Sequence, residues 1–274
     1  MTARILELGS GLRCAVADNA GPMTLDGTRT YLVGEREAVL LDPGPAEGLE
    51  ARLDGLASGR EVTAVALTHA HPDHAAGASG AARRTGAPVA ASPATLERTG
   101  LDGRRLDDGD VLAVDGGASG LTALATPGHA DDHLCFWWPA ERAVFTGDLV
   151  LGSGSAMVGH PDGHMGRYLA SLERLRGLAP DRLYPGHGDP VETADDRLAG
   201  YLRHRREREA QVRRAVEEGA ASVGEVRRRV YGELPEGLDR AAEASIRAHL
   251  EHLRERGIDL PELEDGADGG LDLH

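Results

Sequence analysis

The 274-residue sequence has no lysine, so its 30 basic residues are all arginines, and 45 acidic residues outnumber them. The absence of lysine indicates a biased genome composition rather than a function. The formal net charge of −15 disfavours a general attraction to nucleic acid, whose phosphate backbone is itself anionic. A polyanionic ligand would therefore have to meet a local basic patch.

Long apolar runs are also missing. A membrane-spanning helix needs roughly 20 predominantly apolar residues, whereas apolar stretches such as residues 38–41 and 134–138 have the length of buried strands. The start of the sequence does not combine a basic stretch with an apolar one, so we expect no secretory signal and a cytoplasmic protein. Because there are only two cysteines, Cys14 and Cys135, we expect buried free thiols rather than a disulfide.

What is present is the composition of a globular protein with many turns, with 41% apolar residues and 37 glycines. Residues 30–33 and 38–41 flank a Gly-Glu-Arg-Glu turn and predict a hairpin. We expect further strands at residues 62–67, 89–91, 111–114, 121–125, 134–138, 143–145 and 181–183, and helices at residues 49–56, 75–84 and 168–175. Because strands and helices interleave, the predicted class is α/β, with helices covering the sheets.

The character of the sequence changes near residue 194. Residues 195–218 are polar, arginine-rich and helical, and two more helices are expected at residues 223–231 and 239–256. We therefore predict an α/β domain over residues 1–194, a small helical domain over residues 195–262, and an acidic tail over residues 263–274 that we expect to be largely disordered.

One short stretch concentrates potential metal ligands. Residues 68–74 read Thr-His-Ala-His-Pro-Asp-His and directly follow an expected strand, which would deliver these side chains to the edge of a sheet. Imidazole is the commonest protein ligand of metals, and carboxylate joins it readily at zinc. The spacing allows His69 and His71 to face one ion while Asp73 and His74 reach a second.

Three more potential ligands also follow expected strands. These are His129 after Thr-Pro-Gly, Asp148 after Thr-Gly, and His187 after Tyr-Pro-Gly. Each alone is compatible with an ordinary polar loop residue, but their joint occurrence predicts a metal centre. Gly128 would let the backbone approach this centre closely.

The pattern His69-x-His71-x-Asp73-His74, followed by His129, Asp148 and His187, resembles the ligand set of the metallo-β-lactamase superfamily. The resemblance covers about residues 10–195 and implies an αββα sandwich with a dinuclear site at one edge. It implies a first ion held by His69, His71 and His129, a second held by Asp73, His74 and His187, and a bridging Asp148. It also implies that Asp42, in the Leu-Asp-Pro-Gly turn, supports the ligands from behind.

A closer resemblance is to the β-lactamase-like protein 2 group of that superfamily. The matching stretches are residues 19–34, 126–133 (TPGHADDH), 146–152 (TGDLVLG) and 184–190. This resemblance implies a winged-helix-like domain over about residues 195–262. The chain departs from the group's Gly-Thr-Asn-Thr-Tyr loop at Arg29, and because we expect this loop to overhang the active site, the departure bears on the substrate.

The expected chemistry is metal-dependent hydrolysis. Two divalent ions about 3.5–4 Å apart can share a water and lower its pKa to about 7, which provides a hydroxide nucleophile. We predict that Asp73 orients this nucleophile, and that His133 is a second catalytic residue that either donates a hydrogen bond to the substrate or orders its own loop. Zinc is the expected metal, with manganese or iron as alternatives, because histidine and carboxylate accept all three.

Four functions stay open. The first is hydrolysis of a small thioester, lactone or lactam. The second is cleavage of single-stranded RNA, in which arginines of the C-terminal helices would form a phosphate-binding face. The alternative for these arginines is salt bridges within their own helices. The arginines are Arg203, Arg205, Arg206, Arg208, Arg213, Arg214, Arg227, Arg228 and Arg229. The third makes the C-terminal domain an interaction or homodimerisation module, and the fourth is a mononuclear-iron persulfide oxygenase. We expect a small-molecule partner and no membrane.

The remaining histidines are expected to be exposed. His160 and His164 would lie in a loop at the entrance of the site, and His204, His249 and His252 would be solvated on the C-terminal helices.

Overall fold

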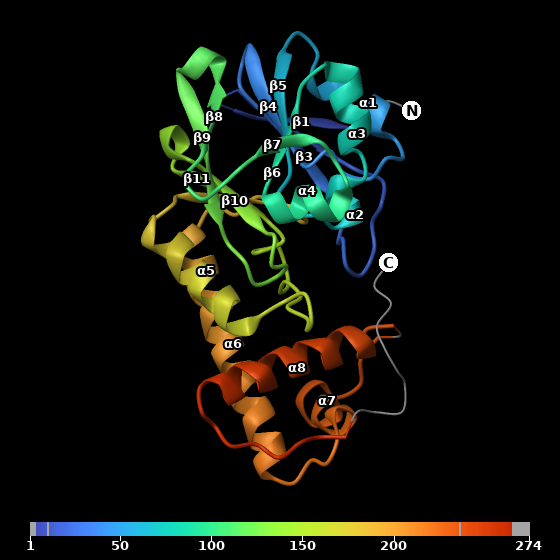
Figure 1. The fold of residues 1–274 in the computed structure, drawn as a ribbon, viewed down its shortest axis with the longest axis vertical. Coiled ribbons are helices and arrows are strands. Elements are labelled where there is room, and N and C mark those ends of the chain that lie inside the picture. The colour runs from blue at the N-terminus through green and yellow to red at the C-terminus, as the bar shows by residue number, and fades with distance from the viewer. Residues whose placement is uncertain (1–3, 10, 236, 265–274) are drawn as a thin grey trace.

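The computed structural model describes residues 4–9, 11–235 and 237–264. Two sheets face each other, helices cover their outer sides, and the C-terminal part is helical (Figure 1). The first sheet has the order β1-β2-β3-β4-β5-β6-β7 and the second the order β12-β11-β10-β9-β8. This arrangement confirms the predicted αββα sandwich.

The first sheet consists of β1 (Ile5–Gly9), β2 (Leu12–Val16), β3 (Arg29–Val33), β4 (Glu37–Leu41), β5 (Glu61–Ala66), β6 (Val89–Ala91) and β7 (Gly103–Arg105). Strands β1 to β4 pair antiparallel and β4 to β7 pair parallel. The predicted hairpin is confirmed as β3-β4, with Leu32 opposite Leu40. Strands β1, β2 and β7 were not expected, and β7 reads Gly-Arg-Arg with all three residues exposed, so it carries no apolar pattern.

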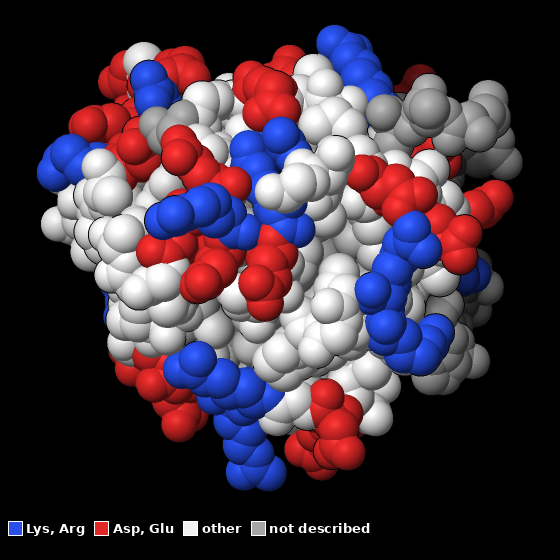
Figure 2. Space-filling view, turned by 90° about the horizontal axis from the view of Figure 1, so that it is seen from above, with Lys and Arg blue, Asp and Glu red and all other residues white. Residues whose placement is uncertain are grey.

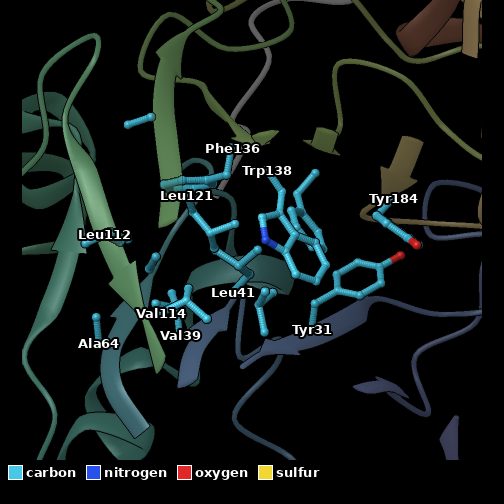
Figure 3. Close-up of a cluster of buried hydrophobic side chains, with 14 of the residues drawn as sticks. Tyr31, Val39, Leu41, Ala64, Leu112, Val114, Leu121, Phe136, Trp138 and Tyr184 are labelled. Atoms are coloured by element: carbon cyan, nitrogen blue, oxygen red, sulfur yellow. The ribbon is translucent and has the colours of Figure 1, made fainter. Parts of the chain in front are cut away.

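The second sheet consists of β8 (Val111–Val114), β9 (Ser119–Ala125), β10 (Leu134–Trp138), β11 (Ala143–Gly147) and β12 (Arg182–Pro185). All neighbouring strands pair antiparallel except β11 and β12, which pair parallel. The main core lies between the sheets, where Tyr31 and Leu41 of the first sheet meet Phe136 and Trp138 of the second (Figure 3). This packing fixes the two sheets relative to each other, and with them the strand ends at one edge.

Helices α1 (Leu49–Leu56), α2 (Pro72–Ala75), α3 (Ala78–Thr85) and α4 (Pro93–Thr99) belong to the side of the first sheet. The helix expected at residues 75–84 begins only at Ala78, in α3, and Ala75 is instead the last residue of the short helix α2. The reason lies at Gly77, whose backbone N–H donates to the Gly44 carbonyl at 2.8 Å instead of continuing the helical ladder. A Cβ at Gly77 would stand 2.8 Å from the same oxygen, so the close contact needs glycine.

Helices α5 (Met165–Gly177) and α6 (Ala194–Glu217) cover the second sheet, and α7 (Val223–Tyr231) and α8 (Asp239–Glu255) complete the C-terminal part. The first half of α6 places Leu198 and Tyr201 in the core beside the second sheet, whereas Val212 and Val216 pack in a separate core with α7 and α8. Helix α6 is thus shared between two cores. Most of the predicted acidic tail, from residue 265 on, lies outside the described residues. Within the described ranges, no helix has the length and apolar character that crossing a membrane requires.

Candidate metal centre

The seven predicted ligands converge at one edge of the sandwich. His69 and His71 follow β5, Asp73 and His74 lie in α2, and the others follow β9, β11 and β12. Their donor atoms form three overlapping groups in which all atoms lie within 4.8 Å of one another: His69, His71 and His129; His69, His74 and Asp148; and Asp73, His74 and His187. The first and last groups have the same members as the two ligand sets that the resemblance implied.

The distances show how tightly the donors approach one another. In the first group, Nδ1 of His71 lies 2.9 Å from Nε2 of His69 and 3.1 Å from Nε2 of His129. In the last group, Nε2 of His187 lies 3.2 Å from Nε2 of His74 and 3.1 Å from Oδ2 of Asp73. Asp148 lies between them, with Oδ1 3.3 Å from Nε2 of His74 and Oδ2 3.8 Å from Nε2 of His129.

The hydrogen bonds behind the ligands determine which ring nitrogen of each histidine carries a proton. Thr68 Oγ1 donates to Oδ2 of Asp42 at 2.7 Å, and it therefore accepts from Nδ1–H of His69 at 2.9 Å. His129 donates from Nδ1 to the Met157 carbonyl at 2.7 Å. In both residues Nε2 is left with a free lone pair that points toward the centre.

The other three imidazoles are held in the same way. His74 donates from Nδ1 to Oδ2 of Asp42 at 2.9 Å, and His187 donates from Nδ1 to the Gly27 carbonyl at 3.3 Å. Nε2 of His71 lies 3.5 Å from Oδ2 of Asp162, which leaves its Nδ1 facing the centre. The role implied for Asp42 therefore has a structural basis, because this carboxylate contacts His74 directly and His69 through Thr68.

These donors fit divalent cations. Lone pairs of several imidazoles that face one another near 3 Å repel unless positive charge lies between them. Oδ1 of Asp148 is also buried and has no hydrogen-bond partner among the described residues. A buried carboxylate oxygen needs a partner, and a bound cation would provide one. Histidine with carboxylate is a donor set that suits zinc, manganese and iron alike.

Electrostatics divide the centre into two unlike halves. Burial and the neighbouring histidines hold the pKa of His69 well below its usual value. Burial alone would also lower the pKa of His187, but the neighbouring carboxylates of Asp148 and Asp73 raise it to about 9. Burial therefore favours the neutral form of His69, while the carboxylates beside His187 strongly attract positive charge.

Two glycines allow close packing around the centre. Gly128 has φ +141°, and a Cβ there would stand 2.3 Å from the Tyr168 Cα, so the close approach at Gly128 is to helix α5 rather than to the metal ligands. At Gly186 a Cβ would stand 2.6 Å from Cε1 of His74 and 2.8 Å from Oδ1 of Asp148.

The two residues predicted as catalytic differ in their surroundings. The Asp73 side chain is 28% exposed and the Asp148 side chain 13%, so Asp73 is the more accessible carboxylate. His133 is buried, its Nε2 accepts from the Asp148 backbone N–H at 3.2 Å, and its Nδ1 lies 3.1 Å from Thr126 Oγ1. Because both ring nitrogens of His133 have partners within the chain, its position favours the loop-ordering alternative.

Two carboxylates that the sequence did not single out also support the centre. Asp132 is buried, and its Oδ2 accepts from the Ala70 backbone N–H at 2.9 Å and from Thr95 Oγ1 at 2.7 Å, which fixes the loop between His69 and His71. Asp132 could have been predicted from the sequence, because it lies in the stretch TPGHADDH that resembles the family. Asp162 faces His71 from a distant loop, and only the fold brings the two together.

Arg29, where the chain departs from the group's loop, has a buried side chain. It is 2% exposed, and its Nη2 contacts Oδ2 of Asp26 at 2.7 Å and Oδ1 of Asp189 at 2.8 Å, while its Nε donates to the Gly188 carbonyl. The guanidinium is drawn inward by these acceptors. Arg29 therefore restrains the loop that contains His187.

The remaining histidines join the sandwich to the C-terminal helices. His160 and His164 contact Glu251 and Glu255 of α8 at 3.1 and 2.9 Å. The expectation that His249 and His252 are solvated is wrong. His249 is fully buried, and Nδ1 of His252 lies 2.6 Å from Oε2 of Glu209. His249 lies on the face of α8 that also carries Ile246, Leu250 and Leu253, and this face packs against α6.

Sequence comparisons agree with this geometry. Residues 23–187 match the model of the metallo-beta-lactamase superfamily. This chain belongs to the metallo-beta-lactamase superfamily. Residues 222–258 match the beta-lactamase-associated winged helix domain, so the predicted winged-helix-like region is confirmed in this metallo-β-lactamase-fold protein.

Several relatives of this metallo-β-lactamase-fold protein cover most of its length. The lactamase-like protein aptB of Emericella nidulans is 34% identical over 257 residues, which are 88% of this chain and 78% of the relative. The beta-lactamase-like protein 2 homolog of Caenorhabditis elegans is 31% identical over 264 residues (93% and 88%), and the atrochrysone carboxyl ACP thioesterase of Aspergillus chevalieri is 34% identical over 241 residues (83% and 75%).

A solved structure agrees as well. A metallo-beta-lactamase family protein from Thermus thermophilus superposes with a TM-score of 0.75 at 26% identity and covers 92% of this chain and 95% of its own. The superfamily match, the cluster of histidines and aspartates, and a relative that is a thioesterase identify the chain as a metallo-β-lactamase-fold hydrolase.

Proposed function

We propose that this hydrolase cleaves a small thioester, or a related carboxyl derivative such as a lactone, with the help of two divalent cations. This proposal depends on the position of Asp148 between the two ligand groups, with Oδ1 toward His74 and Oδ2 toward His129, and on the lack of a hydrogen-bond partner for its buried Oδ1 among the described residues. One relative is named as an ACP thioesterase, which supports a thioester as the substrate. We also propose zinc as the metal and the cytoplasm as the location, both from the sequence.

The chain's own residues divide the remaining work. When bound, the cations supply Lewis acidity and an activated water. Asp73 is accessible, and its Oδ2 lies 3.1 Å from Nε2 of His187, so it can orient the attacking water and take its proton. The cysteines do not supply a nucleophile, because burial raises the pKa of Cys14 to about 11 and that of Cys135 to about 12.

Cleavage of single-stranded RNA has less support. The arginines of the C-terminal helices are largely engaged within the chain: Arg206 with Glu173 at 2.7 Å, Arg213 with Glu217 at 2.7 Å, and Arg227 with Asp239 at 2.8 Å. Arg208 lies over the Tyr231 ring, 4.1 Å from its centroid. At the end of the molecule that lies away from α7 and α8, acidic and basic side chains are interspersed and form no continuous basic surface (Figure 2). Arg213–Glu217 is an i,i+4 pair within α6, whereas Arg206–Glu173 and Arg227–Asp239 join neighbouring helices, and all three pairs disfavour a free phosphate-binding face.

Metal analysis combined with a substrate panel tests the proposal. We expect two metal ions per chain, and hydrolysis of a thioester or lactone that chelation abolishes and zinc restores. One iron per chain together with oxygen consumption would instead indicate a persulfide oxygenase. Hydrolysis of RNA alone, with binding that weakens steeply as salt rises, would indicate a nuclease.

The variant Asp73→Asn separates the proton-accepting role of Asp73 from metal binding. The amide keeps the size and one oxygen of the carboxylate but accepts a proton poorly. We expect kcat to fall by about 10²–10⁴-fold, with the metal content measured on the same sample. A variant that keeps both its metal and its wild-type kcat would remove Asp73 from the mechanism.

A further inference from the structure

A cavity of about 320 Å³ lies beside the metal centre, between the sandwich and the C-terminal helices. Its lining reaches from the metal-facing residues His129 and Asp148 to Arg205 of α6 and Ser245 of α8. The volume falls at the lower end of the range for small-molecule sites, about 300–1,000 Å³. We call this space the helix-side cavity.

The walls of the helix-side cavity are mostly apolar. They are formed by Met23, Leu25, Met157, Tyr231, Leu234 and Leu238, among others. Met23 is 50% exposed, an unusual exposure for a large apolar side chain, and methionine adapts its shape to different ligands. The body of a ligand in this space would therefore be apolar.

Two buried polar groups interrupt the apolar lining. Arg205 is 4% exposed and Ser245 is 6% exposed, and both Nε of Arg205 and Oγ of Ser245 have no hydrogen-bond partner among the described residues. Buried donors without acceptors are costly and therefore rare. The guanidinium is also held in place, because its Nη2 donates to the Ala156 carbonyl and its Cζ lies 5.2 Å from the centroid of the Tyr168 ring.

We propose that Arg205 and Ser245 bind an oxygen acceptor at the distal end of the substrate's acyl group, while the scissile carbonyl lies at the metal-facing residues. This inference rests on the proposed function. The substrate would then be a thioester or lactone whose acyl part is apolar along most of its length and ends in a carbonyl or carboxylate oxygen. A carboxylate suits the site best, because the ion pairs found among the described residues give Arg205 no acidic partner of its own.

Three matched thioesters of one thiol test this assignment on the zinc-loaded protein. Their acyl chains have equal length and end in a methyl, a ketone or a carboxylate group. We expect kcat/KM to favour an oxygen-ended chain over the methyl-ended one by at least about tenfold, since each good hydrogen bond to a charged donor is worth that factor or more. Ser245→Ala and Arg205→Met should each bring this ratio toward one.

A matched variant controls for changes on α6. Arg206 is the next residue, but its side chain is 65% exposed and pairs with Glu173 on the outside. Arg206→Met should keep the wild-type ratio. Ser245→Ala removes only a hydroxyl group, so it keeps the inference testable if Arg205→Met does not fold. A wild-type ratio near one, or an unchanged ratio in both cavity variants, would overturn the assignment.

Binding measurements separate this inference from the proposed function. If no carboxyl derivative is hydrolysed at all, the proposed function fails, and calorimetry with the free acids then tests the cavity alone. We expect the diacid to bind the wild-type protein at least about tenfold more tightly than the methyl-ended acid, with the difference lost in Ser245→Ala. Equal affinities for the two acids would exclude the oxygen-binding role of Arg205 and Ser245.

Discussion

At the scale of single residues, Asp42 connects the two halves of the metal centre. Its Oδ2 accepts both from Nδ1 of His74 and from Thr68 Oγ1, and the same threonine oxygen accepts from Nδ1 of His69. Its Oδ1 accepts from the Thr68 backbone N–H at 2.8 Å. One carboxylate thus sets the tautomer and orientation of one histidine in each ligand group.

The variant Asp42→Ala should therefore weaken metal binding in both halves. Loss of a carboxylate behind a metal-ligating histidine costs about 10–100-fold in affinity, and chelator competition measures the affinity directly. Asp181→Ala is a suitable control, because Asp181 is exposed and pairs only at the surface with Arg142. Wild-type zinc affinity in Asp42→Ala would show that the histidines are oriented by other contacts.

Gly186 is the second test at this scale. In Gly186→Ala the new methyl group would stand 2.6 Å from Cε1 of His74, so the ring or the loop after β12 must move. We expect loss of bound metal and a fall in activity of at least about tenfold, since displacements of about 1 Å at a catalytic centre have effects of this size or larger. Gly177→Ala has open space at the new Cβ and should keep wild-type metal content. Normal metal content and activity in Gly186→Ala would contradict the tight contact.

At the scale of elements, a strand or helix could be predicted when its own residues showed an apolar run or a helical period. The ligands could be predicted because each follows an apolar strand, as Asp148 follows β11. Helix α4 was missed although Ser92 caps it by accepting from the Thr95 N–H at 3.1 Å, because its seven residues are too few to show a clear period. Asp162 and Arg29 escaped prediction for another reason. Their partners, Nε2 of His71 and the loop at residues 188–189, become neighbours only through tertiary contacts.

The contact between α6 and α8 predicts a pH dependence of stability. Burial alone would raise the pKa of Glu209, but the neighbouring His249 and His252 hold it at about 2, with Nδ1 of His249 4.0 Å and Nδ1 of His252 2.6 Å from Oε2 of Glu209. A carboxyl group whose pKa is lower in the folded than in the unfolded state stabilises the fold above the unfolded value, and this contribution is lost as pH falls toward the folded value. The contribution of Glu209 should thus be present at pH 6 and disappear between about pH 4.5 and pH 2.

Glu209→Gln measures this contribution. At pH 6 we expect the free energy of unfolding of the variant to be about 1.5–3 kcal/mol lower than that of the wild type, the usual range for hydrogen bonds to charged groups. The difference should shrink toward zero as the pH is lowered. Glu207→Gln alters an exposed residue of the same helix and should show no such trend. A difference that stays constant from pH 6 to pH 3 would assign the effect to packing rather than to charge.

At the scale of the whole molecule, the segment from Met157 to His164 connects the metal centre with the C-terminal helices. On one side, the Met157 carbonyl accepts from His129 and Asp162 faces His71. On the other side, His160 and His164 contact Glu251 and Glu255 of α8. Positive charge at the metal centre and the position of α8 should therefore influence each other through this short segment.

Metal removal tests this connection. A metal that binds only the folded state at a concentration a thousand times its dissociation constant stabilises that state by about 4 kcal/mol. Chelation should therefore lower the unfolding temperature. Because the segment at residues 157–164 contacts both His129 and α8, hydrogen exchange should also become faster in α8 and not only around residues 69–74. Strands β1 and β2 pair at the far edge of the first sheet, away from this segment, and serve as an internal reference. If chelation lowers the unfolding temperature but leaves exchange in α8 at its metal-bound rate, the C-terminal helices are independent of the metal centre.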